Sequence, residues 1–314
     1  MDALSRIGLG TAPLGNLFTA ISDADAEATV RAAWDGGVRY FDTAPQYGHG
    51  LAELRLGRAL AVLPRDQYTL SSKVGRLLRR VEPRPATIFR DVPEVDPVFD
   101  FSRDGVLRSI DESLTRLGTD RLDVVHVHDP DAHEQEALAT AFPTLIELRE
   151  QGVVDAVGCG MNQCEMLERF VERVDLDCVL LAGRFSLLDR SGGERLLPLC
   201  AARGMQVVVG GVFNSGLLAH PAVGATYDYA TAPPGLVHRA RELQAVCESF
   251  GVTLPAAALQ FALRHPAVTR VVVGARAATE IAADLAFATT VLPDDLWPAL
   301  DLAAGLHFGA HDSP

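Results

Sequence analysis

The stretch Gly37-Val-Arg-Tyr-Phe-Asp42-Thr-Ala-Pro-Gln-Tyr47-Gly48 joins a short apolar, β-prone run to a polar segment that contains proline and glycine. A run of this kind, bounded by turn-forming residues, predicts a short buried strand that ends at Asp42. Two further segments follow the same plan, Leu70-Ser-Ser-Lys73 and Leu122-Asp-Val-Val-His-Val-His128. Polar side chains therefore stand at, or just after, the ends of three successive predicted strands.

Short β-prone runs alternate with longer amphipathic segments along the whole chain. The predicted strands are Arg6–Gly10, Tyr40–Asp42, Thr69–Lys73, Val124–His128, Ala156–Gly160, Cys178–Ala182, Gln206–Gly210 and Arg270–Gly274. The predicted helices are Asp23–Gly36, Ala52–Leu63, Arg103–Leu117, Ala137–Glu150, Gln163–Val174, Glu194–Arg203, Gly235–Phe250 and Ala277–Thr289. Eight strand-then-helix units predict an α/β fold, a (β/α)8 TIM barrel, although a doubly wound sheet uses similar units.

Residues 1–314 contain no linker, repeat or charge block that would divide the chain, so we expect one barrel domain. Two connections are longer than the others, residues 74–101 and 213–234. Loops of that length in a compact fold are usually functional. In a barrel both would emerge at the C-terminal face, where active sites are built.

The chain has 314 residues, 48% of them hydrophobic and 22% charged, and a formal net charge of −13. This acidic balance argues against nucleic acid and against an anionic membrane surface as partners. No run approaches the ~20 apolar residues of a membrane-spanning helix, and the N-terminus lacks a signal-peptide pattern. Five cysteines in apolar patterns favour reduced core thiols. We expect a cytoplasmic protein with a small-molecule substrate and make no prediction of its oligomeric state.

The residues at the three strand ends are suited to proton transfer at a carbonyl or hydroxyl group. A free tyrosine, with a pKa of ~10, is a poor acid or base near neutrality. An ammonium about 4 Å away contributes roughly 4 kcal/mol at an effective dielectric near 20, or about 3 pKa units. We therefore expect Lys73 to bring the pKa of Tyr47 toward neutrality. Asp42 would hold the ammonium, and His128 would direct the substrate oxygen.

Each of these residues alone has an ordinary structural interpretation, such as a helix cap, a solvated lysine or a core histidine. Their joint placement favours a functional one. The run Gly37–Gly57, with its Glu53 and final glycine, resembles the hallmark segment of the aldo-keto reductase family. Lys73 and His128 stand where that family has its other catalytic positions. The resemblance spans nearly the whole chain and implies the catalytic set Asp42, Tyr47, Lys73 and His128, with Tyr47 as proton donor or acceptor.

The resemblance also implies a nicotinamide dinucleotide bound across the barrel mouth. The residues expected to contact it are Gly10, Thr11, Asn162, Phe213, Asn214, Ser215, Gly216, Leu217, Gly274, Arg276, Glu280 and Asp284. Phe213 is expected to stack on the nicotinamide, and the backbone of residues 214–217 to cradle the pyrophosphate. NADP-using members often carry an arginine where this chain has Glu280, so we expect NAD to be preferred, with NADP possible.

Within the family, segments such as His126-Val-His128-Asp-Pro-Asp131 and Gly160-Met-Asn-Gln163 resemble those of bacterial NAD-linked aldose dehydrogenases, of the L-fucose or D-threo-aldose type. They equally resemble pyridoxal 4-dehydrogenase. The resemblance implies that a cyclic hemiacetal hydroxyl, of a sugar or of pyridoxal, is oxidised to a lactone. NAD use would suggest operation as a dehydrogenase.

Three competing interpretations are weaker. Gly8, Gly10 and Gly15 form a poor Rossmann phosphate loop, because the last glycine is misplaced and Pro13 intrudes. His126 and His128 share a strand face, as metal ligands would, but no further ligand set follows, so no metal is predicted. Some aldo-keto reductase-like proteins are cofactor-sensing subunits, an alternative that slow turnover of every carbonyl substrate would reveal.

Overall fold

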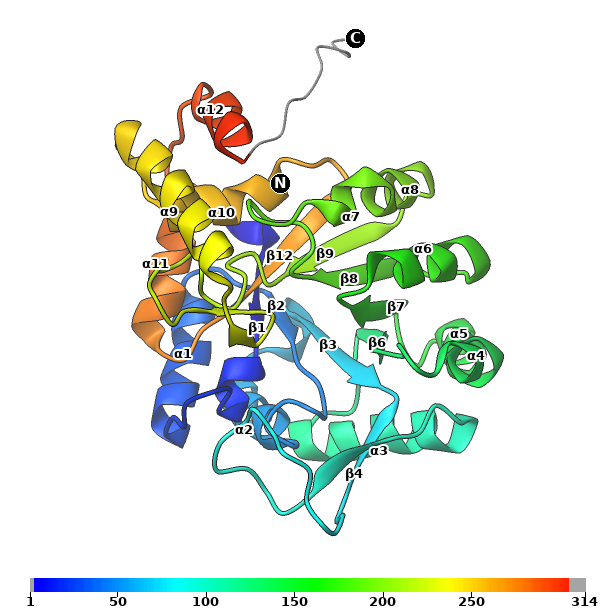
Figure 1. Ribbon diagram of the computed structural model, residues 1–314. Coiled ribbons are helices and arrows are strands. Elements are labelled where there is room, and N and C mark those ends of the chain that lie inside the picture. The colour runs from blue at the N-terminus through cyan, green and yellow to red at the C-terminus, as the bar shows by residue number, and fades with distance from the viewer. Residues whose placement is uncertain (1–2, 305–314) are drawn as a thin grey trace.

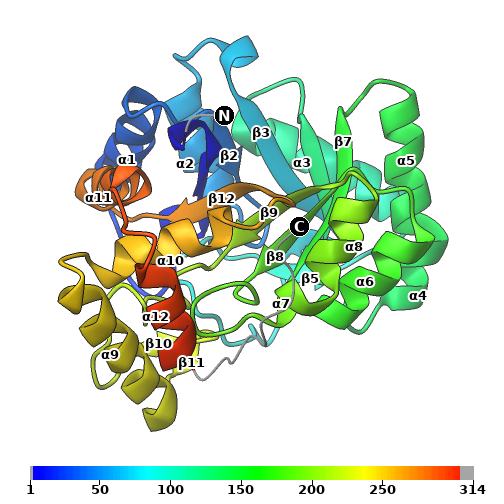
Figure 2. The same cartoon turned by 90° about the horizontal axis from the view of Figure 1, so that it is seen from above.

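A closed barrel of eight parallel strands forms the centre of the computed structural model, which describes residues 3–304. The strand order around the barrel is β1-β12-β9-β8-β7-β6-β3-β2. Figures 1 and 2 show the helices arranged around these strands. The barrel strands are β1 (Ile7–Gly10), β2 (Tyr40–Asp42), β3 (Thr69–Val74), β6 (Val124–His128), β7 (Ala156–Met161), β8 (Cys178–Ala182), β9 (Gln206–Gly210) and β12 (Val268–Gly274).

All eight predicted strands are confirmed, with ends that differ by at most two residues. Neighbouring strands pair in parallel throughout, so their carboxyl ends gather at one mouth. Gly10 pairs with Asp42 on one side and with Gly274 on the other, and Lys73 pairs with His126. The strand ends identified in the sequence therefore meet around a common opening.

Ten long helices are present among the described residues, and eight of them lie at predicted positions. They are α1 (Asp23–Asp35), α2 (Leu51–Leu60), α3 (Arg103–Leu117), α5 (Phe142–Glu150), α6 (Cys164–Arg173), α8 (Leu196–Ala202), α9 (Pro234–Ser249), α10 (Leu254–Leu263), α11 (Ala278–Thr289) and α12 (Leu296–Ala303). Shorter segments α4 (Glu134–Glu136) and the π-helical η4 (Ala137–Ala141) lead into α5, and α7 (Ser191–Glu194) precedes α8. The first helix begins with a capping box, in which Ser22 Oγ accepts from the Asp25 backbone amide.

Two helices were missed in the sequence, α10 and α12. The helix that packs against β12 and α11 is α10, whereas α9 contacts α10 and α12. The sequence interpretation had placed α9 alone between the last two strands. α10 reads Leu-Pro-Ala-Ala-Ala-Leu-Gln-Phe-Ala-Leu and is buried at seven of its positions, so it lacks the polar face that marks an amphipathic helix.

Both long loops carry short antiparallel ribbons that the sequence interpretation left irregular. β4 (Arg76–Arg79) pairs with β5 (Asp96–Phe99), and β10 (Thr226–Tyr227) pairs with β11 (Ala230–Thr231). Several arginines of the first loop are already paired with carboxylates. Arg79, Arg80 and Arg84 form ion pairs with Glu112, Glu94 and Asp96.

The barrel wall contains polar groups as well as aliphatic ones. Side chains of Tyr40, Leu180, Val208 and Val272 form one cluster. Gly158 leaves room beside His126 and Cys178, because a Cβ at this position would overlap His126 Nδ1. A glycine on one strand thus makes space for an imidazole on the next.

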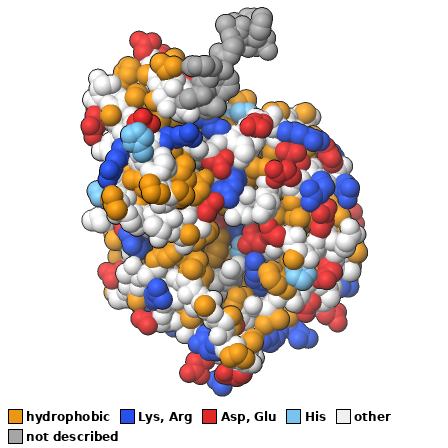
Figure 3. All heavy atoms as spheres, viewed as in Figure 1, with side chains coloured by type: hydrophobic (Ala, Val, Ile, Leu, Met, Phe, Trp, Pro, Cys, Tyr) orange, Lys and Arg blue, Asp and Glu red, His pale blue; other side chains and the backbone are white. Residues whose placement is uncertain are grey.

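The surface mixes charges of both signs. Figure 3 shows acidic and basic side chains interspersed over one face, which is hollowed near its centre. All five cysteines are free and buried, as expected of core thiols. Within residues 3–304, no single helix is long and apolar enough to cross a bilayer; only α9 and α10 taken together, bent by 96° at their junction, pass that test.

Candidate active site

A buried ion pair stands at the ends of β2 and β3. Lys73 Nζ donates to Asp42 Oδ2 at 2.6 Å and to the Thr43 carbonyl at 2.8 Å, while Ser71 Oγ donates to Asp42 Oδ1 at 3.0 Å. Asp42 is 3% and Lys73 2% exposed. Charged groups this deeply buried persist only when paired and hydrogen-bonded. Asp42 and Ser71 therefore fix the lysine in one position.

Tyr47 lies over this lysine. Its ring centroid is 4.7 Å from Lys73 Nζ and 5.8 Å from the centroid of the His128 ring, which it meets edge-on at 89°. His128 is buried, whereas Tyr47 is only half-buried. The turn after β2 thus brings Tyr47 close to Lys73 and His128, and all four predicted catalytic residues meet in one cluster.

The predicted lowering of the Tyr47 pKa is wrong for this structure. Burial of the phenol, followed by the negative charge of Asp42, raises its pKa well above the ordinary value of 10. The sequence estimate counted the ammonium alone. In the fold Asp42 lies 2.6 Å from that ammonium and offsets part of its field at the phenol. Tyr47 is consequently a protonated phenol in the resting protein, ready to donate.

Two charged residues beside His128 were not identified from the sequence. Asp129 Oδ2 lies 3.4 Å from His128 Nε2, and Arg76 Nη2 donates to the same oxygen at 3.2 Å. Burial, then the positive charges of Arg76 and Lys73, lower the pKa of His128 well below 6.5, so its imidazole is neutral. Arg76 lies in the long loop 74–101, in which no individual residue was assigned a role from the sequence. The adjacency of Asp129 to His128 was the one signal available.

His126 on β6 pairs with Lys73 on β3 and is fully buried. Neither ring nitrogen has a hydrogen-bond partner among the described residues. Burial, together with the nearby Lys73, lowers its pKa to about 3. His126 is therefore a neutral group of the barrel interior.

The candidate cofactor residues surround the other half of the same mouth. Gly10 and Gly274 end β1 and β12, Asn162 follows β7, and residues 213–217 follow β9. The catalytic candidates end β2, β3 and β6, on the opposite side of the barrel. Thr11 joins the halves, because its backbone amide donates to the Asp42 carbonyl at 2.9 Å.

Two of these residues carry buried polar atoms that are suited to a polar ligand. Thr11 Oγ1 and Asn214 Oδ1 have no hydrogen-bond partner among residues 3–304, although Thr11 is fully and Asn214 almost fully buried. Unpaired buried polar atoms are rare in native proteins and call for a partner. They fit the carboxamide, ribose or phosphate groups of a dinucleotide. Phe213 packs partly buried against the core, with part of its surface exposed.

In the loop expected to cradle a pyrophosphate, several backbone amides already have hydrogen-bond partners. The amides of Asn214, Gly216 and Leu217 donate to carbonyls within the same loop. Asn214, Ser215 and Gly216 all adopt positive φ, at 45°, 57° and 99°. Ser215 is tied to the β10–β11 ribbon, because its Oγ accepts from the Tyr229 amide at 3.2 Å. The cradle role of residues 214–217 stays a prediction.

In the segment after β12, Arg276 and Glu280 form an ion pair. Glu280 accepts from the Arg276 backbone amide at 2.8 Å and from Arg276 Nη2 at 3.0 Å. Asp284, one turn further along α11, is buried, and burial followed by the charge of Glu280 raises its pKa to about 7. The guanidinium of Arg276 is thus engaged by a carboxylate in the first turn of α11.

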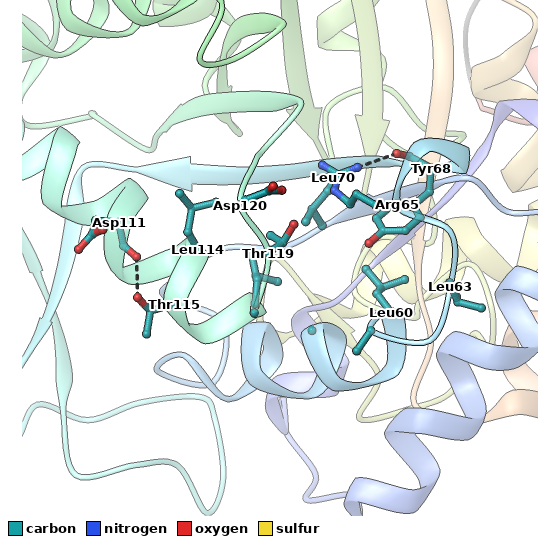
Figure 4. Close-up of a pocket in the computed structure, with 14 residues that line it drawn as sticks. Leu60, Leu63, Arg65, Tyr68, Leu70, Asp111, Leu114, Thr115, Thr119 and Asp120 are labelled. Carbon is teal, nitrogen blue, oxygen red and sulfur yellow. Dashed lines mark hydrogen bonds between the residues drawn. The ribbon is translucent and has the colours of Figure 1, made fainter.

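A large cavity lies elsewhere, outside the barrel wall between α2 and α3. It measures about 630 Å³ and includes Leu60, Arg65, Tyr68, Leu70 and Leu114 among its lining residues (Figure 4). Leu70 is near the start of β3, three residues before Lys73, and points away from the barrel axis. This cavity holds none of the candidate catalytic residues, so we assign it no part in the chemistry. Residues 3–304 contain no group of three or more metal-ligating side chains.

Comparison with known proteins agrees with this geometry. The sequence pattern of the Aldo/keto reductase family matches residues 6–304. A D-threo-aldose 1-dehydrogenase from a Pseudomonas species is 43% identical over 307 residues, 95% of this chain and 93% of the relative. A pyridoxal 4-dehydrogenase from Microbacterium luteolum is 41% identical over 321 residues, again 95% and 93%.

Solved structures give the same fold. An aldo-keto reductase from Bacillus halodurans, in its holo form, superposes with a TM-score of 0.76 at 22% identity, covering 96% of this chain and 93% of that one. The protein therefore belongs to the aldo/keto reductase family and is a nicotinamide-dependent oxidoreductase built on a (β/α)8 barrel.

Proposed function

We propose that this protein oxidises the anomeric hydroxyl of a cyclic aldose to a lactone, with NAD as the hydride acceptor. One observation carries the proposal: a buried Lys73–Asp42 pair lies under a half-buried Tyr47 that faces His128. This cluster belongs to a chain 43% identical to a D-threo-aldose 1-dehydrogenase. Together they support proton transfer at a sugar oxygen.

Each of the four residues has a distinct part in the proposal. Tyr47 Oη takes the hydroxyl proton while the C1–H bond breaks and the C1–O bond becomes a carbonyl. The neutral imidazole of His128 donates a hydrogen bond that orients the same oxygen. Lys73 stabilises the phenolate form of Tyr47, and Asp42 keeps that ammonium in place. A bound nicotinamide supplies the acceptor for the hydride.

The same residues serve the reverse direction. A phenol whose pKa is raised is protonated at neutral pH, which suits donation to a carbonyl oxygen. For oxidation, Tyr47 must first release its own proton to solvent water, which its half-exposed side chain can reach, and the resulting phenolate then takes the hydroxyl proton of the substrate. The net direction then depends on the ratio of oxidised to reduced cofactor, and we propose oxidation because NAD pools are largely oxidised.

The preference for NAD follows from the acidic segment after β12. The Arg276 guanidinium is already paired with Glu280, and Asp284 provides a second carboxyl one helical turn after Glu280. A 2′-phosphate at this place would meet carboxylates instead of a free cation, whereas a ribose hydroxyl can donate to Glu280.

A second substrate, pyridoxal, is favoured by one specific observation. The chain is 41% identical to a pyridoxal 4-dehydrogenase over 95% of its length. Pyridoxal closes to an internal hemiacetal, whose hydroxyl is oxidised to a lactone by the same proton and hydride movements. The four candidate catalytic residues do not distinguish the two substrates.

The test is a spectrophotometric screen of the purified protein. NADH formation is followed with L-fucose, D-arabinose, L-galactose and pyridoxal, and the series is repeated with NADP. We expect turnover of at least one aldose with NAD and much slower turnover with NADP. Binding of NADH without turnover of any substrate would refute the proposal and indicate a cofactor-sensing protein. Equal rates with NADP would refute the cofactor assignment alone.

A further inference from the structure

A partly exposed carboxylate lies beside the candidate proton-transfer residues. Asp129 follows the last residue of β6, and its Oδ2 is 3.4 Å from His128 Nε2. Its side chain is 33% exposed, whereas that of His128 is 8% exposed. Asp129 is thus more exposed to solvent than the catalytic candidate beside it. Nothing in the roles proposed above uses it.

The backbone holds this carboxylate in an uncommon conformation. Asp129 adopts φ +40°, in the left-handed region that residues with a Cβ seldom occupy. Its amide donates to the Gly160 carbonyl at 3.0 Å, which ties the strained residue to the end of β7. Strain of this kind persists where the surroundings impose it, and it clusters at functional sites.

Arg76 fixes one of the two carboxylate oxygens. Its Nη2 donates to Asp129 Oδ2 at 3.2 Å, its Nη1 lies 3.4 Å from the His128 carbonyl, and its guanidinium stacks 4.6 Å from the Phe99 ring centroid. Arg76 is itself buried. Asp129 Oδ1 has no hydrogen-bond partner among residues 3–304. One oxygen is thus anchored, and the other remains able to accept.

An aromatic side chain faces the same region. Tyr229, in the β10–β11 turn, is 53% exposed and packs 6.3 Å from the Phe18 ring. Burial of its hydroxyl and the charge of Asp129 both raise the Tyr229 pKa, and Tyr229 in turn raises that of Tyr47. The three side chains are therefore within electrostatic reach of one another.

We propose that Asp129 is a specificity-determining residue that accepts a hydrogen bond from the substrate hydroxyl next to the reacting carbon. The inference rests on the proposed function and names its substrate class: an aldose with a free C2 hydroxyl. The reacting oxygen is directed by His128 Nε2, which lies 3.4 Å from the Asp129 carboxylate. Oxygens on adjacent sugar carbons are about one hydrogen-bond length apart. A substrate held by His128 therefore places its neighbouring hydroxyl within reach of Asp129.

The chemistry of a carboxylate makes this contact selective. An ionised carboxylate only accepts hydrogen bonds, and its bonds to hydroxyl groups are stronger than neutral ones. A substrate that lacks the hydroxyl leaves the carboxylate desolvated and unpaired, which is how a polar site rejects a deoxy analogue. We expect roughly a 10- to 100-fold preference in kcat/KM for the hydroxylated member of a matched pair.

The experiment compares D-arabinose with 2-deoxy-D-ribose, which differs from it only by lacking the C2 hydroxyl, and L-fucose with 2-deoxy-L-fucose. In the Asp129→Asn variant the preference should shrink to a few-fold, because the hydroxylated sugar slows while the deoxy sugar changes little. Asp131→Asn removes a neighbouring exposed carboxylate and is the matched control, expected to keep the wild-type ratio. Asp129→Ala is a second variant, and circular dichroism checks that each protein is folded.

The outcomes separate the inference from the function on which it rests. If wild-type protein oxidises none of the four sugars, the proposed function fails and the inference fails with it. A wild-type protein that oxidises both members of a pair equally well overturns the inference alone, without any variant. So does an Asp129→Asn variant that slows both members equally, since Asp129 would then act only by orienting His128.

Discussion

Replacing Lys73 by methionine removes the charge on which the proposed chemistry depends. Lys73 Nζ lies 4.7 Å from the Tyr47 ring centroid, so at an effective dielectric near 20 the ammonium alone would stabilise a phenolate by about 3.5 kcal/mol. The Asp42 carboxylate, 2.6 Å from the ammonium, offsets part of this. We expect kcat/KM to fall by about 10²-fold, measured as NADH formation with the best aldose of the screen.

The same substitution should also destabilise the fold. Asp42 is 3% exposed and would lose the partner that now lies 2.6 Å away. Removing one member of a buried pair typically costs about 3–5 kcal/mol. For a chain of this size that lowers Tm by on the order of 10 °C in a thermal unfolding scan.

A double variant separates the two effects. Lys73→Met combined with Asp42→Asn leaves no uncompensated charge, so it should regain much of the lost Tm. Its activity should stay low, because no cation remains beside Tyr47. Recovery of both stability and activity in the double variant would refute our argument, since Lys73 would then be only the counter-ion of Asp42.

Three further predictions concern other residues. Tyr47→Phe should lower kcat/KM by roughly 10²–10⁴-fold and leave NADH affinity, measured by fluorescence titration, unchanged; a variant with near wild-type rates would exclude Tyr47 as the proton carrier. Glu280→Ala frees Arg276 from its carboxylate and should raise the ratio of kcat/KM for NADP over NAD about 10-fold, whereas a constant ratio would show that this pair does not select the cofactor. The pKa of Asp284 is raised from 3.8 to about 7, so the folded protein binds this proton more tightly than the unfolded chain. The free energy that this proton contributes to folding is therefore fully present below about pH 4 and is lost as pH rises toward 7, by as much as about 4 kcal/mol. Asp284→Asn should remove this pH-dependent loss of stability. The Tm of the variant should then exceed that of wild type at pH 8 but not at pH 4.

Much of the candidate site was predictable because it follows local rules. Each barrel strand is a short β-prone run bounded by turn residues, and parallel strands bring their carboxyl ends together. Once the eight runs were recognised, Asp42, Lys73 and His128 had to lie at one mouth. Tyr47 followed from its fixed distance along the turn after β2.

Other features depend on which residues meet through space. α10 has no polar face, so no periodicity marks it, and only its packing against β12 and α11 shows that it covers the barrel. The partnership of Arg76 with Asp129 joins positions more than fifty residues apart. A pattern read along the chain contains neither fact.

By itself the sequence determined the eight strand–helix units, the four candidate catalytic residues and the acidic character of the segment after β12. These depend on residue type and spacing, which are properties of the chain. Tertiary structure alone decided the electrostatics: Asp42 lies 2.6 Å from the Lys73 ammonium, and Tyr47 is therefore a protonated phenol. The physical reason is that the effect of a charge depends on the distance to every other charge and on burial, and folding sets both.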